Sequence, residues 1–321
     1  MRIADCEEML MSERDQQSEI RDPKSEIPWH RSVLLQEVVT WLAPAPGKTI
    51  VDCTVGSGGH SLAILPRLLP DGQLIAIDCD AKALAMARQR LTEFHPRVQF
   101  VHDNFRYLPE ILNRLGLTAV HGLIADLGLS SFHVDQADRG FSFLKEGPLD
   151  MRMDQRVATT AASLIHRIPE RELAELIQTY GEERWARRIA RRIVTARTRE
   201  QIRTTTQLAR LVAEAMPTRA HHQRIHPATR TFLALRIAVN EELACLESLL
   251  NALPNVLMPG GRAVVIAFHS LEDRLVKQAL QRGAKAGVFR VLTKKPIRPG
   301  SLEVAENPRA RSARLRAVER V

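Results

Sequence analysis

The sequence predicts an α/β fold with a mostly parallel sheet and an inserted helical domain. Short apolar runs alternate with helical patterns over 49–127. The alternation stops over 134–227, where only helical patterns occur, and it resumes over 229–268. Strands that alternate with helices of about ten residues form βαβ units, whose strands are parallel. One α/β domain built from both ends of the chain is the economical arrangement.

Each predicted element has its own pattern. Four strands are predicted before the insertion, with helices between them; the strands are 49–53, 73–78, 98–103 and 121–127. After the insertion we predict one long helix over 229–253, ended by the turn MPGG at 258–261. The predicted strand 262–268 is apolar after its first residue, Arg262, which is typical of an interior parallel strand. The predicted domains are 26–133 with 228–321, the inserted helical domain 134–227, and a flexible N-terminal extension over 1–25.

The composition of the chain limits its possible cellular location and the kinds of cysteine or metal site it can contain. No apolar run approaches the roughly 18–20 residues that a membrane helix needs, and the charged start lacks the apolar centre of a secretory signal. We therefore expect a cytoplasmic protein without a membrane partner. The four cysteines show neither CxxC pairing nor histidines at zinc-finger spacing; they are Cys6, Cys53, Cys79 and Cys245. Reduced thiols and no metal site are expected.

Positive charge is concentrated in two blocks. The chain carries a formal charge of +9. Over 184–224 there are eleven Arg against two acids, and over 282–321 eleven Lys and Arg against three Glu. The rest of the chain is therefore net negative. Such a distribution indicates a polyphosphate partner, although a solvated helix face and a basic tail remain the alternative.

The first basic block contains an amphipathic helix. Trp185, Ile189, Ile193 and Ala196 fall on one arc, and the Arg side chains fall on the opposite arc. The candidate residues for RNA phosphates on that arc are Arg187, Arg188 and Arg191. Planar guanidinium groups suit phosphate oxygens, so this face is the predicted nucleic-acid contact.

A glycine turn follows the first strand. TVGSGGHS places Gly56, Gly58 and Gly59 where the chain must turn beside a ligand, and the next helix offers free N–H groups there. Asp78 ends the second strand, where a carboxylate accepts both hydroxyls of a ribose. The alternative is that Asp78 and Asp80 only cap the following helix. Turn and carboxylate together favour a cofactor that contains a nucleoside.

The end of the fourth strand distinguishes between cofactors. The turn lacks the full GxGxxG spacing of dinucleotide-binding proteins. Asp126, at the end of IADLGLSS, points into the ligand crevice of an open α/β sheet. Methyltransferases that act on amino groups place an acidic or amide residue there, against the target nitrogen. We therefore predict S-adenosylmethionine, with Asp126 or a carbonyl of 126–131 as the acceptor; a carboxylate satisfied by backbone N–H groups is the alternative.

From about residue 30 to the C-terminus the chain resembles the ribosomal RNA small subunit methyltransferase H family. The resemblance implies a Rossmann-like class I methyltransferase fold. It also implies methyl transfer from S-adenosylmethionine to N4 of a decoding-region cytosine of 16S ribosomal RNA, with that RNA or the small subunit as partner and no obligate protein partner. The motifs that carry it are HRSVLLQE (30–37), VGSGGH (55–60), AIDCD (76–80), DLGLSS (126–131), RGFSF (139–143), GPLDMRMD (147–154), YGEER (180–184), HPATRTF (226–232), GGRAVVIAFHSLEDR (260–274) and NPRARSARLR (307–316).

Carried over by position, the family's cofactor contacts fall on seven residues. His133 stands where the family commonly has Gln, and the first 25 residues have no family counterpart. Both His and Gln side chains form hydrogen bonds. The seven residues are Gly58, Gly59, His60, Asp78, Phe105, Asp126 and His133.

Other residues leave alternatives open. His226 and Pro227 could simply mark the return of the chain from the insertion, with Thr229 or a neighbour capping the next helix. Alternatively, His226 and Arg230 face the RNA or the mouth of the active site. His269, Ser270 and Asp273 lack the nucleophile elbow and the order of a hydrolytic triad. The tail 307–316 lacks apolar periodicity, so phosphate contact is expected there. A DNA amino-methyltransferase is disfavoured because [DNS]PP[YFW] is absent from the fourth strand. An RNA-binding assembly factor without catalysis is the rival from another class.

Overall fold

The computed structural model describes residues 32–129, 131–217 and 225–321, without the side chains of Ser131 and Phe132. The predicted extension 1–25 lies outside the described residues. Residues Arg31–Val321 form one compact unit. The predicted division into two domains stays a prediction.

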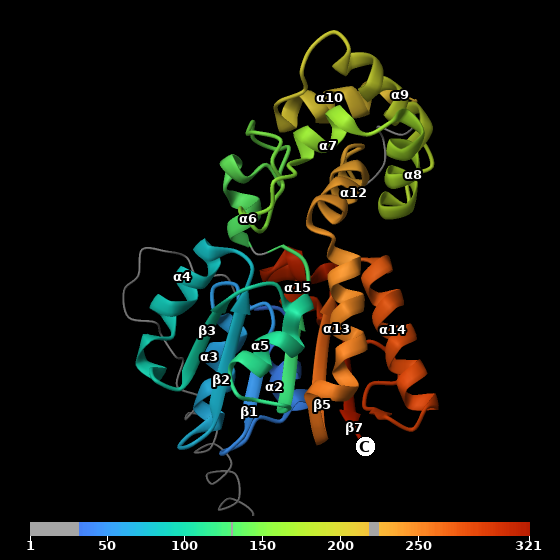
Figure 1. The fold of residues 1–321 in the computed structure, drawn as a ribbon. Coiled ribbons are helices and arrows are strands. Elements are labelled where there is room, and N and C mark those ends of the chain that lie inside the picture. Colours follow the sequence, from blue (N-terminus) through green and yellow to red (C-terminus); the bar gives the residue numbers. More distant parts are fainter. Residues whose placement is uncertain (1–31, 130, 218–224) are drawn as a thin grey trace, which may run out of the picture. The chain divides into compact units, whose positions relative to one another are not determined.

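A seven-stranded sheet organises the α/β part of the chain, in the order β3-β2-β1-β4-β5-β7-β6 (Figure 1). Its first five strands are parallel, and β7 runs antiparallel to both of its neighbours. The mostly parallel, Rossmann-like sheet of a class I methyltransferase is thereby confirmed. The strands are β1 Thr49–Asp52, β2 Gln73–Asp78, β3 Val98–His102, β4 Val120–Asp126, β5 Leu257–Ala267, β6 Phe289–Val291 and β7 Arg314–Arg320.

Alternate side chains along the strands pack into two separate hydrophobic cores, one on each face of the sheet. Val51 and Ile75 belong to the core on one face of the sheet, whereas Ile50 and Leu74 belong to the core on the other face. A period of two along a strand produces this division. The first face is covered by α5 Leu108–Arg114, α13 Glu242–Val256 and α14 Ser270–Lys285. The second is covered by α2 Leu35–Leu42, α3 Gly59–Leu68 and α4 Ala81–Arg90.

The chain between β4 and α13 forms a third core, which is helical. Apart from an isolated bridge between Pro148 and Thr204, the described part of 134–217 contains no strand, as predicted. Apolar faces of five helices meet in this core. They are α7 Ala161–Arg167, α8 Glu170–Gly181, α9 Ala186–Arg197, α10 Thr205–Ala215 and α12 Thr229–Asn240; the short α6 Ser131–Asp135 precedes them.

The predicted single helix over 229–253 is wrong. It is two helices, α12 and α13, separated at Glu241, whose φ of 49° is left-handed. The apolar pattern continues across the break, but its halves serve different cores: Phe232 packs in the helical core and Leu249 packs on the sheet. The turn predicted at 258–261 instead lies inside β5, where the pairing with β4 is irregular.

The prediction that the tail 307–316 contacts phosphate rather than packing is wrong for part of it. Leu315 is completely buried in β7, which lies between β5 and β6. Arg316 donates to the Oδ1 atom of Asp273 at 2.7 Å. Charged side chains at alternate positions made this strand hard to predict from the sequence. An Arg side chain on one face of the strand, when it is paired with an acid, does not prevent burial of the side chains on the other face. Before β7 lie α15 Ser301–Glu306 and the 3₁₀ helix η4 Pro308–Ser312.

Candidate cofactor and active site

The first five strands end at one edge of the sheet, here called the carboxyl edge, and a glycine turn follows β1 there. Gly56 and Gly58 have φ of 53° and 84°, which favour glycine. A Cβ on Gly59 would lie 2.0 Å from the Ser32 Oγ atom. Helix α3 begins at Gly59 without a side-chain cap, and the first N–H groups of a helix have no partner within it, which suits them to an anionic or polar ligand.

The carboxylate of Asp78 is oriented by the backbone of this turn. Its Oδ2 atom accepts the Gly56 N–H at 2.9 Å, and its Oδ1 atom accepts the Asp80 N–H at 2.9 Å. Burial raises the pKa of Asp78, and the two N–H bonds oppose that shift. The capping alternative fits Asp80, which accepts the Lys82 N–H at the start of α4. Each Asp78 oxygen keeps a lone pair for a hydroxyl donor, so the residue fits a ribose.

Asp126 ends β4 at the same edge and faces His60 of α3. Its Oδ2 atom lies 3.3 Å from the His60 Nε2 atom, and its backbone N–H donates to Thr54 Oγ1 at 2.7 Å. The Asp126 Oδ1 atom is buried and has no hydrogen-bond partner among the described residues. The alternative interpretation, in which backbone N–H groups satisfy the Asp126 carboxylate, is therefore not supported by the described residues. A buried acceptor of this kind requires a donor from a ligand or water.

Asp52, at the end of β1, is a buried acid that sequence reasoning missed. Its Oδ2 atom accepts the Ser61 hydroxyl at 2.7 Å. Burial raises its pKa to about 6. Burial alone would lower the pKa of His60, but the interaction with the nearby Asp126 carboxylate, with the charge of Asp52, raises it. An acid at the end of an otherwise apolar strand was the signal available in the sequence.

A second buried cluster joins α4 to the chain after β4. The Asp80 Oδ2 atom lies 2.7 Å from both the His133 Nε2 atom and the Arg139 Nη1 atom. Burial alone would raise the pKa of Asp80, but the hydrogen bonds from His133 and Arg139 lower it. The cofactor contact expected of His133 stays a prediction, since its Nε2 faces Asp80. Sequence reasoning missed Arg139, whose motif RGFSF was the available signal.

Phe105 lies just beyond the end of β3 and begins the 3₁₀ helix η2 Phe105–Tyr107. Its side chain is partly buried against the core of α5 and α13. The structure therefore places five predicted residues at or just beyond the ends of four neighbouring strands, as their positions in the sequence required. These are Gly58, Gly59, Asp78, Phe105 and Asp126.

The predicted Arg face is present on α9. Ile189 and Ile193 are buried, whereas Arg187, Arg188 and Arg191 are exposed, which confirms the amphipathic pattern. The Arg188 guanidinium lies over the Trp185 ring, 5.6 Å from its centroid. Among the described residues, these three side chains form no hydrogen bond or ion pair with residues at the carboxyl edge. Their RNA contact stays a prediction.

Arg230 and His226 take structural roles in the described chain. The Arg230 Nη1 atom donates to the backbone oxygen of Glu182 at 2.8 Å. The His226 ring stacks on Phe143 with centroids 4.6 Å apart, and its Nδ1 atom accepts the Ala228 N–H. These contacts fit the interpretation that this segment has a structural role where the chain returns from the insertion. The RNA contact of Arg230 stays a prediction.

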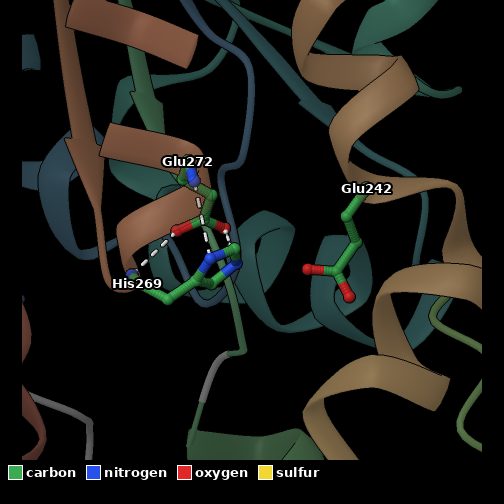
Figure 2. A group of neighbouring side chains, drawn as sticks. All are labelled: Glu242, His269 and Glu272. Atoms are coloured by element: carbon green, nitrogen blue, oxygen red, sulfur yellow. Dashed lines mark hydrogen bonds and ion pairs between the residues drawn. The ribbon is translucent and has the colours of Figure 1, made fainter. Parts of the chain in front are cut away.

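Glu242, His269 and Glu272 form a group with metal-ligand chemistry, drawn in Figure 2. Their existing contacts account for it. His269 and Glu272 form a capping box at the start of α14, and their Nε2 and Oε1 atoms lie 3.1 Å apart. Both carboxylate oxygens of Glu242 accept from Arg236 at 2.7 Å. Since Arg236 already neutralises the Glu242 carboxylate, and His269 and Glu272 pair with each other, we assign no metal here.

The other two members of the rejected triad are also engaged. The Ser270 hydroxyl donates to Glu182 at 2.7 Å, and Asp273 pairs with Arg316.

Among the described residues, no helix is both long and apolar enough to cross a membrane.

Known proteins resemble this chain over nearly its whole length. The MraW methylase family matches residues 28–321. A relative from Geobacter sulfurreducens, named ribosomal RNA small subunit methyltransferase H, is 50% identical over 307 residues, covering 91% of this chain and 99% of its own. A relative of the same name from Symbiobacterium thermophilum is 48% identical over 304 residues, covering 90% and 96%. These matches confirm the predicted methyltransferase and its S-adenosylmethionine cofactor. The chain belongs to the MraW methylase family.

Proposed function

We propose that this chain transfers a methyl group from S-adenosylmethionine to N4 of a decoding-region cytosine in small-subunit ribosomal RNA. The names of its relatives support the ribosomal substrate, and the sequence resemblance supports the base and its position. The observation that carries the chemistry is the buried Asp126 Oδ1 atom, which lacks a partner among the described residues. An exocyclic amine is a donor that would satisfy it.

The cofactor would be held along the carboxyl edge. The turn at Gly58 and Gly59 gives close approach of the backbone, and Asp78 accepts the ribose hydroxyls. Phe105 offers its ring to the adenine, and His60 and His133 complete the proposed contacts. Bound S-adenosylmethionine supplies an electrophilic methyl group and a thioether leaving group.

Asp126 would align and deprotonate the target amine. The lone pair of N4 is delocalised into the cytosine ring, so the nitrogen is a weak nucleophile until it becomes tetrahedral. A hydrogen bond to Asp126 Oδ1 orients the amine, and the same atom takes a proton as the new N–C bond forms. Orientation of this kind contributes several kcal/mol, with a ceiling of roughly 7–11 kcal/mol. A carbonyl of 126–131 is the alternative acceptor.

The helical part of the chain would hold the RNA. We propose 134–227 as a substrate domain, inserted between the two halves of the methyltransferase domain. Its basic surface on α9 would bind phosphates, and Arg230 would join it at the start of α12. The target base must be unstacked to reach a pocket at the carboxyl edge, so contacts to the flanking backbone are required.

Methyl transfer from tritiated cofactor tests the function directly. Small ribosomal subunits, naked small-subunit RNA and duplex DNA are offered in parallel, and labelled nucleosides are identified after digestion. Label in N4-methylcytidine from RNA or subunits is expected. Label in DNA would support the rival DNA amino-methyltransferase. RNA binding without transfer to any substrate would support an assembly factor that has lost catalysis.

A further inference from the structure

The chain before β7 borders the carboxyl edge of the sheet. Asp126 pairs with Ile266 of β5, Ile266 with Leu315 of β7, and Leu315 with Ile297 in an isolated bridge. Ile297 therefore lies in the same row as Asp126, three strand spacings or roughly 15 Å away. Because this bridge is antiparallel to β7, the chain after Ile297 runs on towards the carboxyl edge.

Residues 298–311, here called the C-terminal rim, then pass along that edge. The Glu303 Oε1 atom accepts the Leu34 N–H at 2.7 Å, at the start of α2. The charge of Glu303 also acts on His60. Further along, the Arg309 Nη2 atom lies 2.7 Å from the Asp135 Oδ1 atom of α6. The C-terminal rim thus runs from beside β7 to helices that flank His60 and Asp126.

Three arginines of the C-terminal rim face solvent on an anchored backbone. Arg298, Arg309 and Arg311 are exposed, whereas Ala310 is completely buried. Within the described chain, Arg298 and Arg311 form no ion pair with an acid. Among the described residues, Arg309 pairs only with the exposed Asp135, and an exposed ion pair of this kind contributes little to stability. All three guanidinium groups are therefore available to an anion.

We propose that Arg298, Arg309 and Arg311 bind RNA phosphates next to the target nucleotide. The inference rests on the proposed function, since it requires an RNA base at the carboxyl edge. An unstacked base that enters there brings its own phosphates to the border of the crevice, where Arg groups offer forked donors. The surface differs from the Arg face of α9, whose described side-chain partners, Glu170 and Trp185, lie in the helical part of the chain. It also assigns a role to basic residues that the packing of β7 leaves exposed.

The experiment compares two variants with equal loss of charge. The rim variant is Arg298→Gln, Arg309→Gln and Arg311→Gln. The amino-edge control is Arg67→Gln, Arg282→Gln and Lys285→Gln, three exposed residues at or near the C-terminal ends of α3 and α14. Those helices follow parallel strands and end at the opposite edge of the sheet. Affinity for a transcribed fragment of small-subunit RNA is measured at five salt concentrations.

The rim variant should bind more weakly, with a log-affinity versus log-salt slope shallower by roughly two to three, since each phosphate contact contributes about 0.7–0.9. The amino-edge control should keep a slope close to the wild-type slope. A third variant with Lys at the three rim positions should retain most of the slope, because it keeps the charge. Cofactor affinity by calorimetry should stay unchanged and shows that each variant is folded.

The results separate the inference from the proposed function. A rim variant that matches wild type, or that loses no more slope than the amino-edge control, overturns the inference while methyl transfer by wild type upholds the function. A wild-type chain that neither binds nor methylates the RNA overturns both.

Discussion

The His60 Nε2 atom lies 3.3 Å from the Asp126 Oδ2 atom, while the Asp126 Oδ1 atom is buried without a partner among the described residues. His60 lies in the first turn of α3, which follows β1, and Asp126 ends β4, so adjacent parallel strands bring the two together. The Oδ2 atom is therefore engaged by the His60 ring, and the Oδ1 atom is left for a hydrogen-bond donor. This asymmetry assigns different tasks to the two oxygens.

Asp126→Asn should lower methyl transfer by roughly a hundredfold, the lower end of the range for general acid–base catalysis. The amide keeps the shape of the carboxylate but accepts a proton poorly. Single-turnover transfer to small-subunit RNA measures the effect, and thermal unfolding shows that the variant is folded. Full activity with normal cofactor affinity would exclude the side chain and leave the carbonyls of 126–131 as acceptors.

The same variant should change the titration of His60. Burial would lower the pKa of this imidazole, and the interaction with Asp126 is the main cause that raises it. In Asp126→Asn the pKa of His60 should therefore fall. Nuclear magnetic resonance of the ring protons in the cofactor-free protein measures this without any enzymatic assay. An unchanged His60 titration would show that the pair does not form in solution.

Asp78→Ala should weaken S-adenosylmethionine binding by about 1–3 kcal/mol, the range for hydrogen bonds to a charged group. The substitution also removes the acceptor of the Gly56 N–H, so it loosens the glycine turn. Calorimetric titration measures the affinity. Asp71→Ala, at an exposed position before β2, is the matched control and should bind as wild type does. Equal affinity of a folded Asp78→Ala would contradict the ribose assignment.

Asp52→Asn should become more stable relative to wild type as the pH rises. Burial raises the pKa of Asp52 from 3.8 to about 6, so its stabilising contribution is complete below about pH 4 and is lost as the pH rises through 6. Asparagine can still accept the Ser61 hydroxyl and carries no charge. Between pH 4.5 and pH 7.5, the difference in unfolding free energy between variant and wild type, measured with urea, should change by about 2 kcal/mol. Parallel stability curves for wild type and variant would falsify this prediction.

Gln at Arg187, Arg188 and Arg191 should weaken RNA binding at every sequence alike. Phosphate contacts carry no sequence information, and the salt slope should become shallower by roughly two to three. Cofactor affinity should stay at the wild-type value, because the described partners of these side chains, Glu170 and Trp185, do not belong to the carboxyl edge. The amino-edge control serves here as well. An unchanged slope would mean that this face is only solvated.

The sequence by itself determined the five parallel strands, the glycine turn and the positions of Asp78 and Asp126. These features depend on local patterns: apolar strands of four to eight residues, helices between them, and polar residues at strand ends. A parallel sheet brings all such ends to one edge, so residues far apart in the chain could be assigned to one site. The amphipathic helix α9 was predictable for the same reason, since a period of 3.6 is visible without any partner.

Tertiary structure alone decided which elements share a core and which charges are paired. The break at Glu241 leaves no mark in the apolar period, because α12 and α13 bury their faces against different partners. The pairing of β7 between β5 and β6 joins strands separated by the whole of α14. Asp80, His133 and Arg139 lie up to 59 residues apart in the chain, yet they form one buried cluster. Long-range packing and the satisfaction of buried charge are properties of the folded chain, so no local pattern could contain them.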